Sequence, residues 1–227
     1  MTKKHYQKIA NFIRTKQVIV CNSTTCTSNE RFIDKDLLVK ELCDLFSADN
    51  PNFNKEKFLK LAEGKEGYLF PDTYFFTNKE TPEEIINKMQ DNFKVKAGDV
   101  QKDILIMASI IEKEARKPED RKIISGILWK RIKEGMPLQV DAVFDYLLDK
   151  ESSEITQADL KMDSPYNTYK HKGLPPTPIC NPGLDAIEAA ENPVDSKFWY
   201  YLSDKTGVTH FARTFEEHKQ NKFRYLK

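Results

Sequence analysis

The feature that most constrains this chain is an apolar run that ends abruptly in charge, from Ile104 to Ala115. At roughly 100° per residue, Ile104, Ala108 and Ala115 share one helical face, and other apolar residues cover most of the remainder. A helix that is apolar all round is a core helix. The run therefore predicts a buried helix around which a domain packs.

Two carboxylates, Glu112 and Glu114, stand in the second half of this helix. Residues two apart on a helix point to nearly opposite sides, so the two cannot act as a facing pair. Each borders apolar surface, which would raise the pKa of its carboxyl by desolvation. A glutamic acid that is protonated near neutral pH can act as a general acid. The competing interpretation is the solvated end of an ordinary helix.

Composition excludes several classes of function. With 36 Lys and Arg against 35 Asp and Glu, the chain lacks the excess positive charge of nucleic-acid-binding proteins, and we expect no nucleic-acid partner. Four cysteines and four histidines at no recognisable ligand spacing predict no metal site. Cys21 and Cys26 could pair only in an oxidising compartment. No stretch reaches the roughly 20 apolar residues of a membrane helix, and the basic start lacks the apolar core of a signal peptide.

We expect an α+β chain with a small α/β unit over residues 1–62 and a helical catalytic domain over residues 63–227. In the first unit, Val18–Cys21 predicts a strand and Asp34–Phe46 a helix. Further elements follow from periodicity, caps and turn residues: helices over 54–62, from Thr81, from Pro118 to Gly135, over 142–148 and 184–191 and from Thr214, with a hairpin over 198–203 and 209–212.

Polar residues mark the loops between these elements. Gln139 and Asp141 lie two apart in a predicted extended stretch, where both would face one side. A solvated edge is the alternative. Ser164–Tyr169 and the proline-rich Gly173–Gly183 predict rigid loops, and loops on a scaffold are where binding residues concentrate.

Several motifs together resemble the MltG (YceG-like) family of endolytic murein transglycosylases, over about residues 60 to 220. The resemblance rests on their order and spacing: Glu66–Tyr74, Ala108–Glu114, Met136–Asp141, Ser164–Tyr169 and Gly173–Ile179. It implies a LysM-like unit ahead of the catalytic domain, of which residues 1–62 would be a truncated form. It also implies a membrane anchor, absent from this chain, and a location at the extracytoplasmic face of the bacterial inner membrane.

The resemblance implies a reaction that needs no cofactor. Such an enzyme cleaves the β-1,4 bond between N-acetylmuramic acid and N-acetylglucosamine and leaves a 1,6-anhydro ring. One glutamic acid protonates the glycosidic oxygen and then accepts the proton of the attacking C6 hydroxyl. By this resemblance Glu112 is the catalytic residue, and Glu114 is structural, paired with Arg116 or a loop.

The resemblance also suggests residues that orient the sugar or stabilise developing charge. For each of them the alternative is an ordinary satisfied loop hydrogen bond. The candidates are Glu66, Gln139, Asp141, Tyr166, Asn167 and Thr168.

Glycan strands of peptidoglycan are the expected partner, and peptidoglycan synthases are a second class that the family suggests. A non-catalytic peptidoglycan-binding scaffold of the synthesis machinery is the main alternative. An ordinary hydrolase would leave reducing ends in place of anhydro ends. A pyridoxal-phosphate lyase is disfavoured, because no Gly-rich phosphate cradle and no marked lysine are present.

Overall fold

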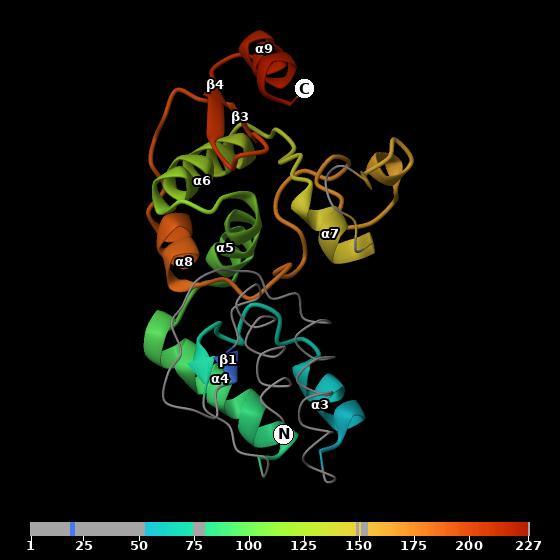
Figure 1. The fold of residues 1–227 in the computed structure, drawn as a ribbon, viewed down its shortest axis with the longest axis vertical. Coiled ribbons are helices and arrows are strands. Elements are labelled where there is room, and N and C mark those ends of the chain that lie inside the picture. The colour runs from blue at the N-terminus through green and yellow to red at the C-terminus, as the bar shows by residue number, and fades with distance from the viewer. Residues whose placement is uncertain (1–18, 21–52, 75–79, 149, 151–153, 227) are drawn as a thin grey trace. The chain divides into compact units, whose positions relative to one another are not determined.

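The computed structural model describes residues 19–20, 53–74, 80–148, 150 and 154–226 (Figure 1). The chain divides into two compact units. Unit 1 contains Met1–Asp99 with Cys180–Gly183, and unit 2 contains Val100–Ile179 with Leu184–Lys227. The boundary between the two compact units thus lies near Asp99, whereas the sequence analysis placed the domain boundary after residue 62. The predicted helix at 34–46 and most of the predicted LysM-like unit lie outside the described residues, so that part of the fold stays a prediction.

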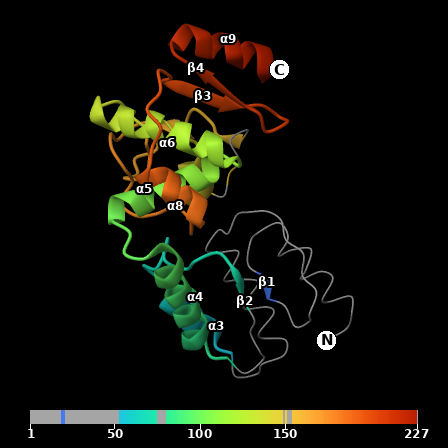
Figure 2. The same cartoon turned by 90° about the vertical axis from the view of Figure 1, so that its left-hand side faces the viewer.

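Unit 1 is built on helices α3 (Lys55–Ala62) and α4 (Pro82–Ala97). They share a core that includes Phe58, Ile85 and Met89, each fully buried. This shared core is why residues 63–99 belong with α3, and the two helices lie beside one another (Figure 2). Strand β1 (Ile19–Val20) pairs in parallel with β2 (Thr73–Tyr74), which confirms the strand predicted there.

Local chemistry explains where α4 begins. The Thr81 hydroxyl accepts from the Glu84 backbone, and the Glu84 carboxylate accepts from the Thr81 backbone N–H at 2.7 Å. This capping box satisfies donors that the first turn would otherwise leave unpaired, and Pro82 fits the first helical position. The predicted helix start is therefore confirmed.

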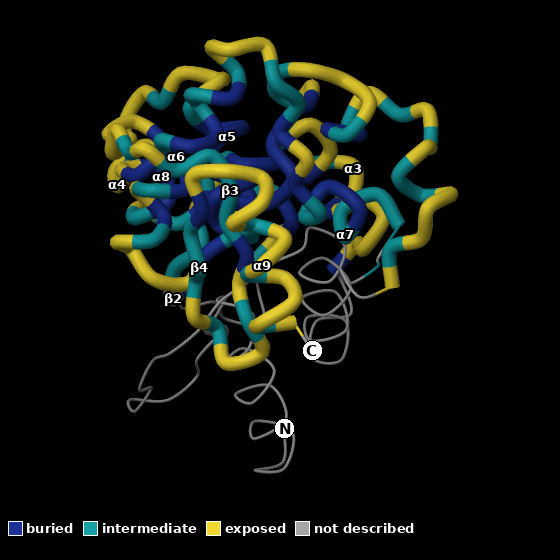
Figure 3. The backbone as a smooth tube through the Cα atoms, turned by 90° about the horizontal axis from the view of Figure 1, so that it is seen from above, coloured by how far each residue is buried: buried dark blue, intermediate teal, exposed yellow. Residues whose placement is uncertain are grey.

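Unit 2 is organised around α5 (Lys102–Glu114), which is the predicted core helix. Leu105, Met107, Ile110 and Ile111 on this helix are each 0% exposed. Helices α6 (Pro118–Lys133) and α8 (Leu184–Glu191) pack against it and against each other (Figure 1), and the short α7 (Ala142–Leu148) contacts it as well. In Figure 3 the α5 backbone is dark blue, the colour of buried residues. A short 3-10 turn, η2 (Asp159–Lys161), precedes the 164–169 loop.

The segment after α8 crosses α6 at a glycine. The backbone N–H of Val194 donates to Lys122 O at 3.0 Å, and a Cβ placed on Gly126 would lie 1.9 Å from Val194 O. Only a residue without a side chain allows this approach. Gly126 therefore fixes how closely the chain after α8 can pack on α6.

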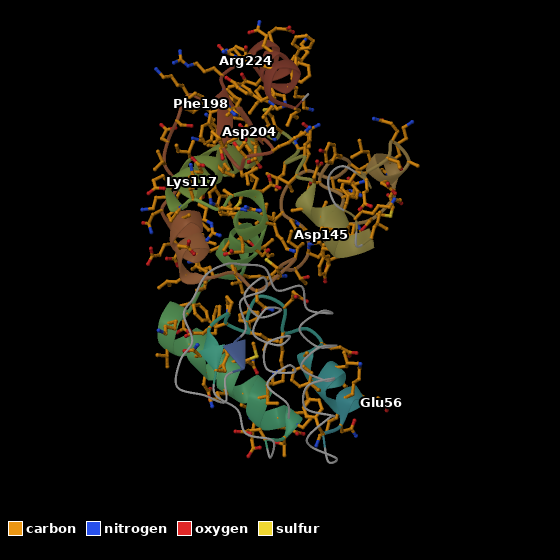
Figure 4. All side chains as sticks on the ribbon, in the orientation of Figure 1. Glu56, Lys117, Asp145, Phe198, Asp204 and Arg224 are labelled. Carbon is orange, nitrogen blue, oxygen red and sulfur yellow. The ribbon has the colours of Figure 1, made fainter. Side chains whose placement is uncertain are left out.

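A β-hairpin and a last helix complete unit 2. Strands β3 (Tyr200–Ser203) and β4 (Thr209–Ala212) pair antiparallel, as predicted, and α9 (Phe215–Tyr225) packs across them (Figure 2). Asp204, labelled in Figure 4, holds the turn. Its carboxylate accepts from Thr206 N at 2.8 Å and Val208 N at 3.1 Å, and lies 2.8 Å from His210 Nε2.

Thr214 caps the start of α9, where this helix was predicted to begin. The Thr214 hydroxyl accepts from Glu217 N at 3.2 Å, but the Glu217 carboxylate accepts from Arg213 N at 2.7 Å.

Among the described residues no helix is long and apolar enough to cross a membrane. The architecture is mixed α+β, which confirms the predicted class at that level.

Candidate active site

Glu112 and Glu114 leave α5 in different directions, as their spacing predicts. Glu112 lies toward α6, where its Oε1 is 2.6 Å from Nη2 of Arg121. Glu114 lies toward β3, where it accepts from the Tyr201 hydroxyl at 2.9 Å. The two carboxylates therefore belong to separate environments and are considered one at a time.

The environment of Glu112 is that of a structural brace. Glu112 is 4% exposed, and Arg121 is 1% exposed. Arg121 also donates from Nε to Ala115 O at 2.9 Å, and its Nη1 lies 2.6 Å from Oδ1 of Asp185 on α8. One guanidinium thus ties together the end of α5, the start of α6 and the start of α8.

This geometry argues against Glu112 as the catalytic acid. A general acid must come within hydrogen-bond reach of the oxygen that it protonates. The Glu112 carboxylate is shut away from solvent and bonded to a buried cation, so a sugar cannot reach it without breaking the brace. The assignment of Glu112 made from the sequence stays a prediction, and its contact with Arg121 counts against it.

Glu114 lies in a different environment from Glu112. It is only partly buried, and desolvation raises the pKa of its carboxyl to about 7. The nearby charge of Asp141 raises that pKa further, while hydrogen bonds from Tyr201 and from the Ala142 backbone and the charge of Arg131 lower it. The prediction of a raised carboxyl pKa on this helix is confirmed at Glu114.

The residues around Glu114 come from five segments of unit 2, and we call them the acid cluster: Glu114 of α5, Arg131 of α6, Asp141 of the turn before α7, Tyr169 of the 164–170 loop and Tyr201 of β3. Tyr169 donates its hydroxyl to Asp141 Oδ1 at 2.5 Å. Burial and the neighbouring carboxylates raise the pKa of Tyr169 and of Tyr201 well above the usual tyrosine range. Both hydroxyls therefore remain donors.

Arg131 is fixed in this cluster by backbone carbonyls. It donates from Nη1 to Leu138 O at 2.6 Å and from Nη2 to Trp199 O at 2.7 Å. Nearby, Lys113 bonds to Asp145 of α7, labelled in Figure 4, at 2.8 Å. These contacts hold Leu138 against α6 and Asp145 against the end of α5.

The predicted extended stretch before α7 is not a strand. Gln139 has φ +53°, a left-handed conformation that is uncommon for a residue other than glycine. Its N–H donates to Thr168 O at 3.1 Å, which ties the turn to the 164–170 loop. Gln139 is exposed, whereas Asp141 is partly buried and held by Tyr169. No strand forms over residues 136–141, and the left-handed conformation of Gln139 interrupts the extended backbone that a strand needs, so that expectation is wrong.

Asn167 and Thr168 have the contacts of loop-bracing residues. Asn167 is 0% exposed, and its side chain donates to Leu160 O at 3.1 Å and Met162 O at 2.8 Å and accepts from Tyr169 N at 3.0 Å. Thr168 is 2% exposed and accepts from Val140 N at 3.1 Å. These are the satisfied loop hydrogen bonds of the alternative interpretation, and contact with a sugar stays a prediction.

Two further candidates lie in different surroundings. Tyr166 is partly buried, its hydroxyl is 2.7 Å from Thr177 Oγ1, and its ring lies 5.2 Å from that of Tyr146. Glu66 lies in unit 1 and is 8% exposed. It precedes a loop whose Gly67 and Leu69 N–H groups both donate to Asn181 Oδ1, at 2.8 and 3.0 Å. Their predicted roles toward substrate stay predictions.

Sequence reasoning missed Tyr169, Tyr201 and Arg131. Tyr201 was visible only as part of an aromatic strand, and Arg131 only as a charge on a helix. Nothing local to either residue signals that it meets Glu114, because each comes from a distant segment. In the part of the chain that the structure describes, no three His, Cys, Asp or Glu side chains gather to form a metal site.

The family is decided by comparison with known proteins. A sequence profile of the YceG-like family matches residues 3–224. The chain belongs to the YceG-like family. A YceG-like protein from Listeria monocytogenes has a solved structure with a TM-score of 0.62 and 36% identity, covering 82% of this chain and 64% of that one.

Proteins of known name are also similar in sequence. An endolytic murein transglycosylase of Bacillus subtilis is 38% identical over 209 residues, which is 87% of this chain and 56% of that protein. One of Streptococcus pneumoniae is 37% identical over 172 residues, 69% of this chain and 31% of that protein. The chain thus spans from about a third to just over half of the length of these relatives.

Proposed function

We propose that this member of the YceG-like family is a lytic transglycosylase that acts on the glycan strands of peptidoglycan, with Glu114 as its general acid and base. Its relatives are named endolytic murein transglycosylases, which supports the substrate class. The acid cluster supports the choice of residue. The observation that carries the proposal is the partly exposed Glu114, whose pKa of about 7 lies near neutrality.

The proposed reaction uses Glu114 twice. As the protonated acid it donates a proton to the oxygen of the β-1,4 bond, and the bond between that oxygen and the anomeric carbon of the muramyl residue breaks. As the carboxylate it accepts the proton of the C6 hydroxyl, whose oxygen attacks the same carbon and closes the 1,6-anhydro ring. A pKa near the working pH favours both steps, because neither protonation state is costly to reach.

One acid suffices because the attacking hydroxyl belongs to the substrate. Glycoside hydrolases ordinarily need a second carboxylate to activate water or to act as the nucleophile. Asp141 is a carboxylate near Glu114, but its Oδ1 is held by the Tyr169 hydroxyl. That hydrogen bond favours a supporting role for Asp141, and it favours transglycosylation over hydrolysis.

Candidate sugar contacts are the side chains that remain accessible near the 164–170 loop. Gln139 is exposed, and its backbone is fixed to that loop through Thr168. The Tyr166 hydroxyl, beside Thr177, could exchange one neutral partner for a sugar hydroxyl. The predicted role of Glu66, which lies in unit 1, stays a separate proposal. In this proposal the protein works at the extracytoplasmic face of the bacterial inner membrane, near peptidoglycan synthases.

The test is the chemistry of the products. Purified glycan strands are digested and the new ends are identified by mass spectrometry. We expect anhydro-muramyl ends. Reducing ends alone would instead mark a hydrolase. Intact strands that nevertheless bind the protein would mark a scaffold without catalytic activity.

A further inference from the structure

We propose that Asp141 is a positioning residue for Glu114, which it keeps protonated before cleavage, and that Tyr201 opposes it by favouring the carboxylate. Asp141 then acts through Glu114 and makes no contact with the glycan. This inference rests on the proposed function, and it names the residues that set the protonation of the proposed acid. The sequence suggested only that Asp141 contacts substrate or holds its loop.

The geometry places Asp141 beside Glu114 through its neighbour in the chain. The backbone N–H of Ala142 donates to the Glu114 carboxylate, so Asp141, one residue earlier, lies within a few ångströms of the same group. The Tyr169 hydroxyl holds Asp141 Oδ1 at 2.5 Å, and Gln139 N is tied to Thr168 O at 3.1 Å. The Asp141 carboxylate is thus held by Tyr169, and the backbone just before Asp141 is tied to the same loop.

A fixed negative charge beside a carboxyl group disfavours ionisation of that group, and hydrogen-bond donors favour it. Asp141 supplies the negative charge. Tyr201 and Ala142 supply the donors, and Arg131, held by Leu138 and Trp199 carbonyls, supplies the positive charge. Tyr169 faces the same group as a neutral hydroxyl. Desolvation acts in the same direction as Asp141, and the balance leaves the pKa of Glu114 at about 7.

Two substitutions should therefore move the protonation of Glu114 in opposite directions. In Asp141→Asn the nearby charge is lost while the side chain keeps its shape and its acceptor for Tyr169. In Tyr201→Phe a donor to the Glu114 carboxylate is lost. The matched control is Asp163→Asn, which removes one negative charge from an exposed residue paired with Lys170 in the same unit.

The experiment is a pH titration of the glutamate side-chain carboxyl carbons by 13C NMR, with the Glu114 signal identified by its loss in Glu114→Gln. We expect the midpoint of Glu114 to fall by about one pH unit in Asp141→Asn and to rise by a similar amount in Tyr201→Phe. Asp163→Asn should leave it unchanged. The high-pH limb of kcat/KM for strand cleavage should move in the same directions.

An unmoved Glu114 midpoint in folded Asp141→Asn would overturn the inference, and loss of cleavage with that unmoved midpoint would make Asp141 a substrate contact. Thermal unfolding of each variant verifies that it is folded. The titration needs no substrate, so it separates this inference from the proposed function. Shifted midpoints together with full cleavage by Glu114→Gln would uphold the inference and defeat the proposed function.

Discussion

The carboxylates of Glu112 and Glu114 are held from different sides of α5, the first by Arg121 at 2.6 Å and the second by Tyr201 at 2.9 Å. Two residues of one motif therefore have separate roles. Glu112 bonds to Arg121, whose guanidinium joins three helices, and Glu114 lies in a partly exposed cluster. The predictions below follow from this division and from the packing that maintains it.

The brace around Arg121 should dominate the stability of unit 2. Removing one partner of a buried ion pair leaves an uncompensated charge, so Arg121→Ala should lower the free energy of unfolding by about 3 to 5 kcal/mol. Urea unfolding measures this change. Lys219→Ala removes half of an exposed pair with Glu216 and should cost less than about 1 kcal/mol. Equal losses of unfolding free energy in the two variants would show that the buried Arg121 contacts contribute no more to stability than an exposed ion pair.

The raised pKa of Glu114 makes a prediction about stability and pH. Between the ordinary value of 4.5 and about 7, the folded state keeps a proton that the unfolded state has lost, so stability falls as pH rises through that window. Glu114→Gln removes this dependence. The wild type therefore loses stability from about pH 5 to about pH 8 and the variant does not. Over this range the stability of the variant relative to the wild type should rise by about 1 to 3 kcal/mol.

Denaturant unfolding at both pH values measures that gain. Glu134→Gln, at an exposed glutamate of the same unit, is the control and should show no comparable change between the two conditions. If the stability difference between wild type and Glu114→Gln stayed constant across this range, the Glu114 carboxyl would not carry a raised pKa.

Gly126 should tolerate no side chain. A methyl group there would lie 1.9 Å from Val194 O, so Gly126→Ala must push the chain after α8 away from α6. We expect a loss of about 1 to 3 kcal/mol, as for overpacked cores, although alanine is the better helix former. Chemical denaturation of Gly126→Ala and of Lys122→Ala, an exposed site on the same helix, provides the comparison. A stabilised Gly126→Ala would contradict the close approach.

Asn167 and Gln139 should separate loop bracing from sugar contact. Asn167→Ala leaves two backbone carbonyls and one N–H without their partner, which should cost about 1 to 3 kcal/mol in unfolding free energy. Gln139→Ala changes an exposed side chain and should alter stability by less than about 0.5 kcal/mol, while raising the KM for glycan strands. Unchanged stability in Asn167→Ala would restore it as a candidate for substrate binding.

Much of the fold followed from local patterns in the sequence. The all-round apolar run at 104–115 predicted the buried α5, and Thr81, Pro82 and Pro118 marked helix starts. These features depend on neighbours within one turn. The opposite directions of Glu112 and Glu114 followed from helical geometry in the same way.

The partners of the two carboxylates could not be predicted in this way. Arg121 reaches Glu112 from the next helix, and Asp185, its other partner, comes from α8. Tyr201 reaches Glu114 from β3, 87 positions later in the chain. The conformation of Gln139 was equally hidden, because its φ is positive and its N–H bonds to Thr168 in a separate loop. Tertiary contacts decided each of these outcomes.

The most direct measurement compares Glu114→Gln with Glu112→Gln in the digestion of purified glycan strands, with anhydro-muramyl ends counted per folded molecule. The account predicts that Glu114→Gln forms almost none, whereas the fraction of Glu112→Gln that remains folded still forms them. Loss of cleavage in well-folded Glu112→Gln, together with normal cleavage by Glu114→Gln, would contradict it.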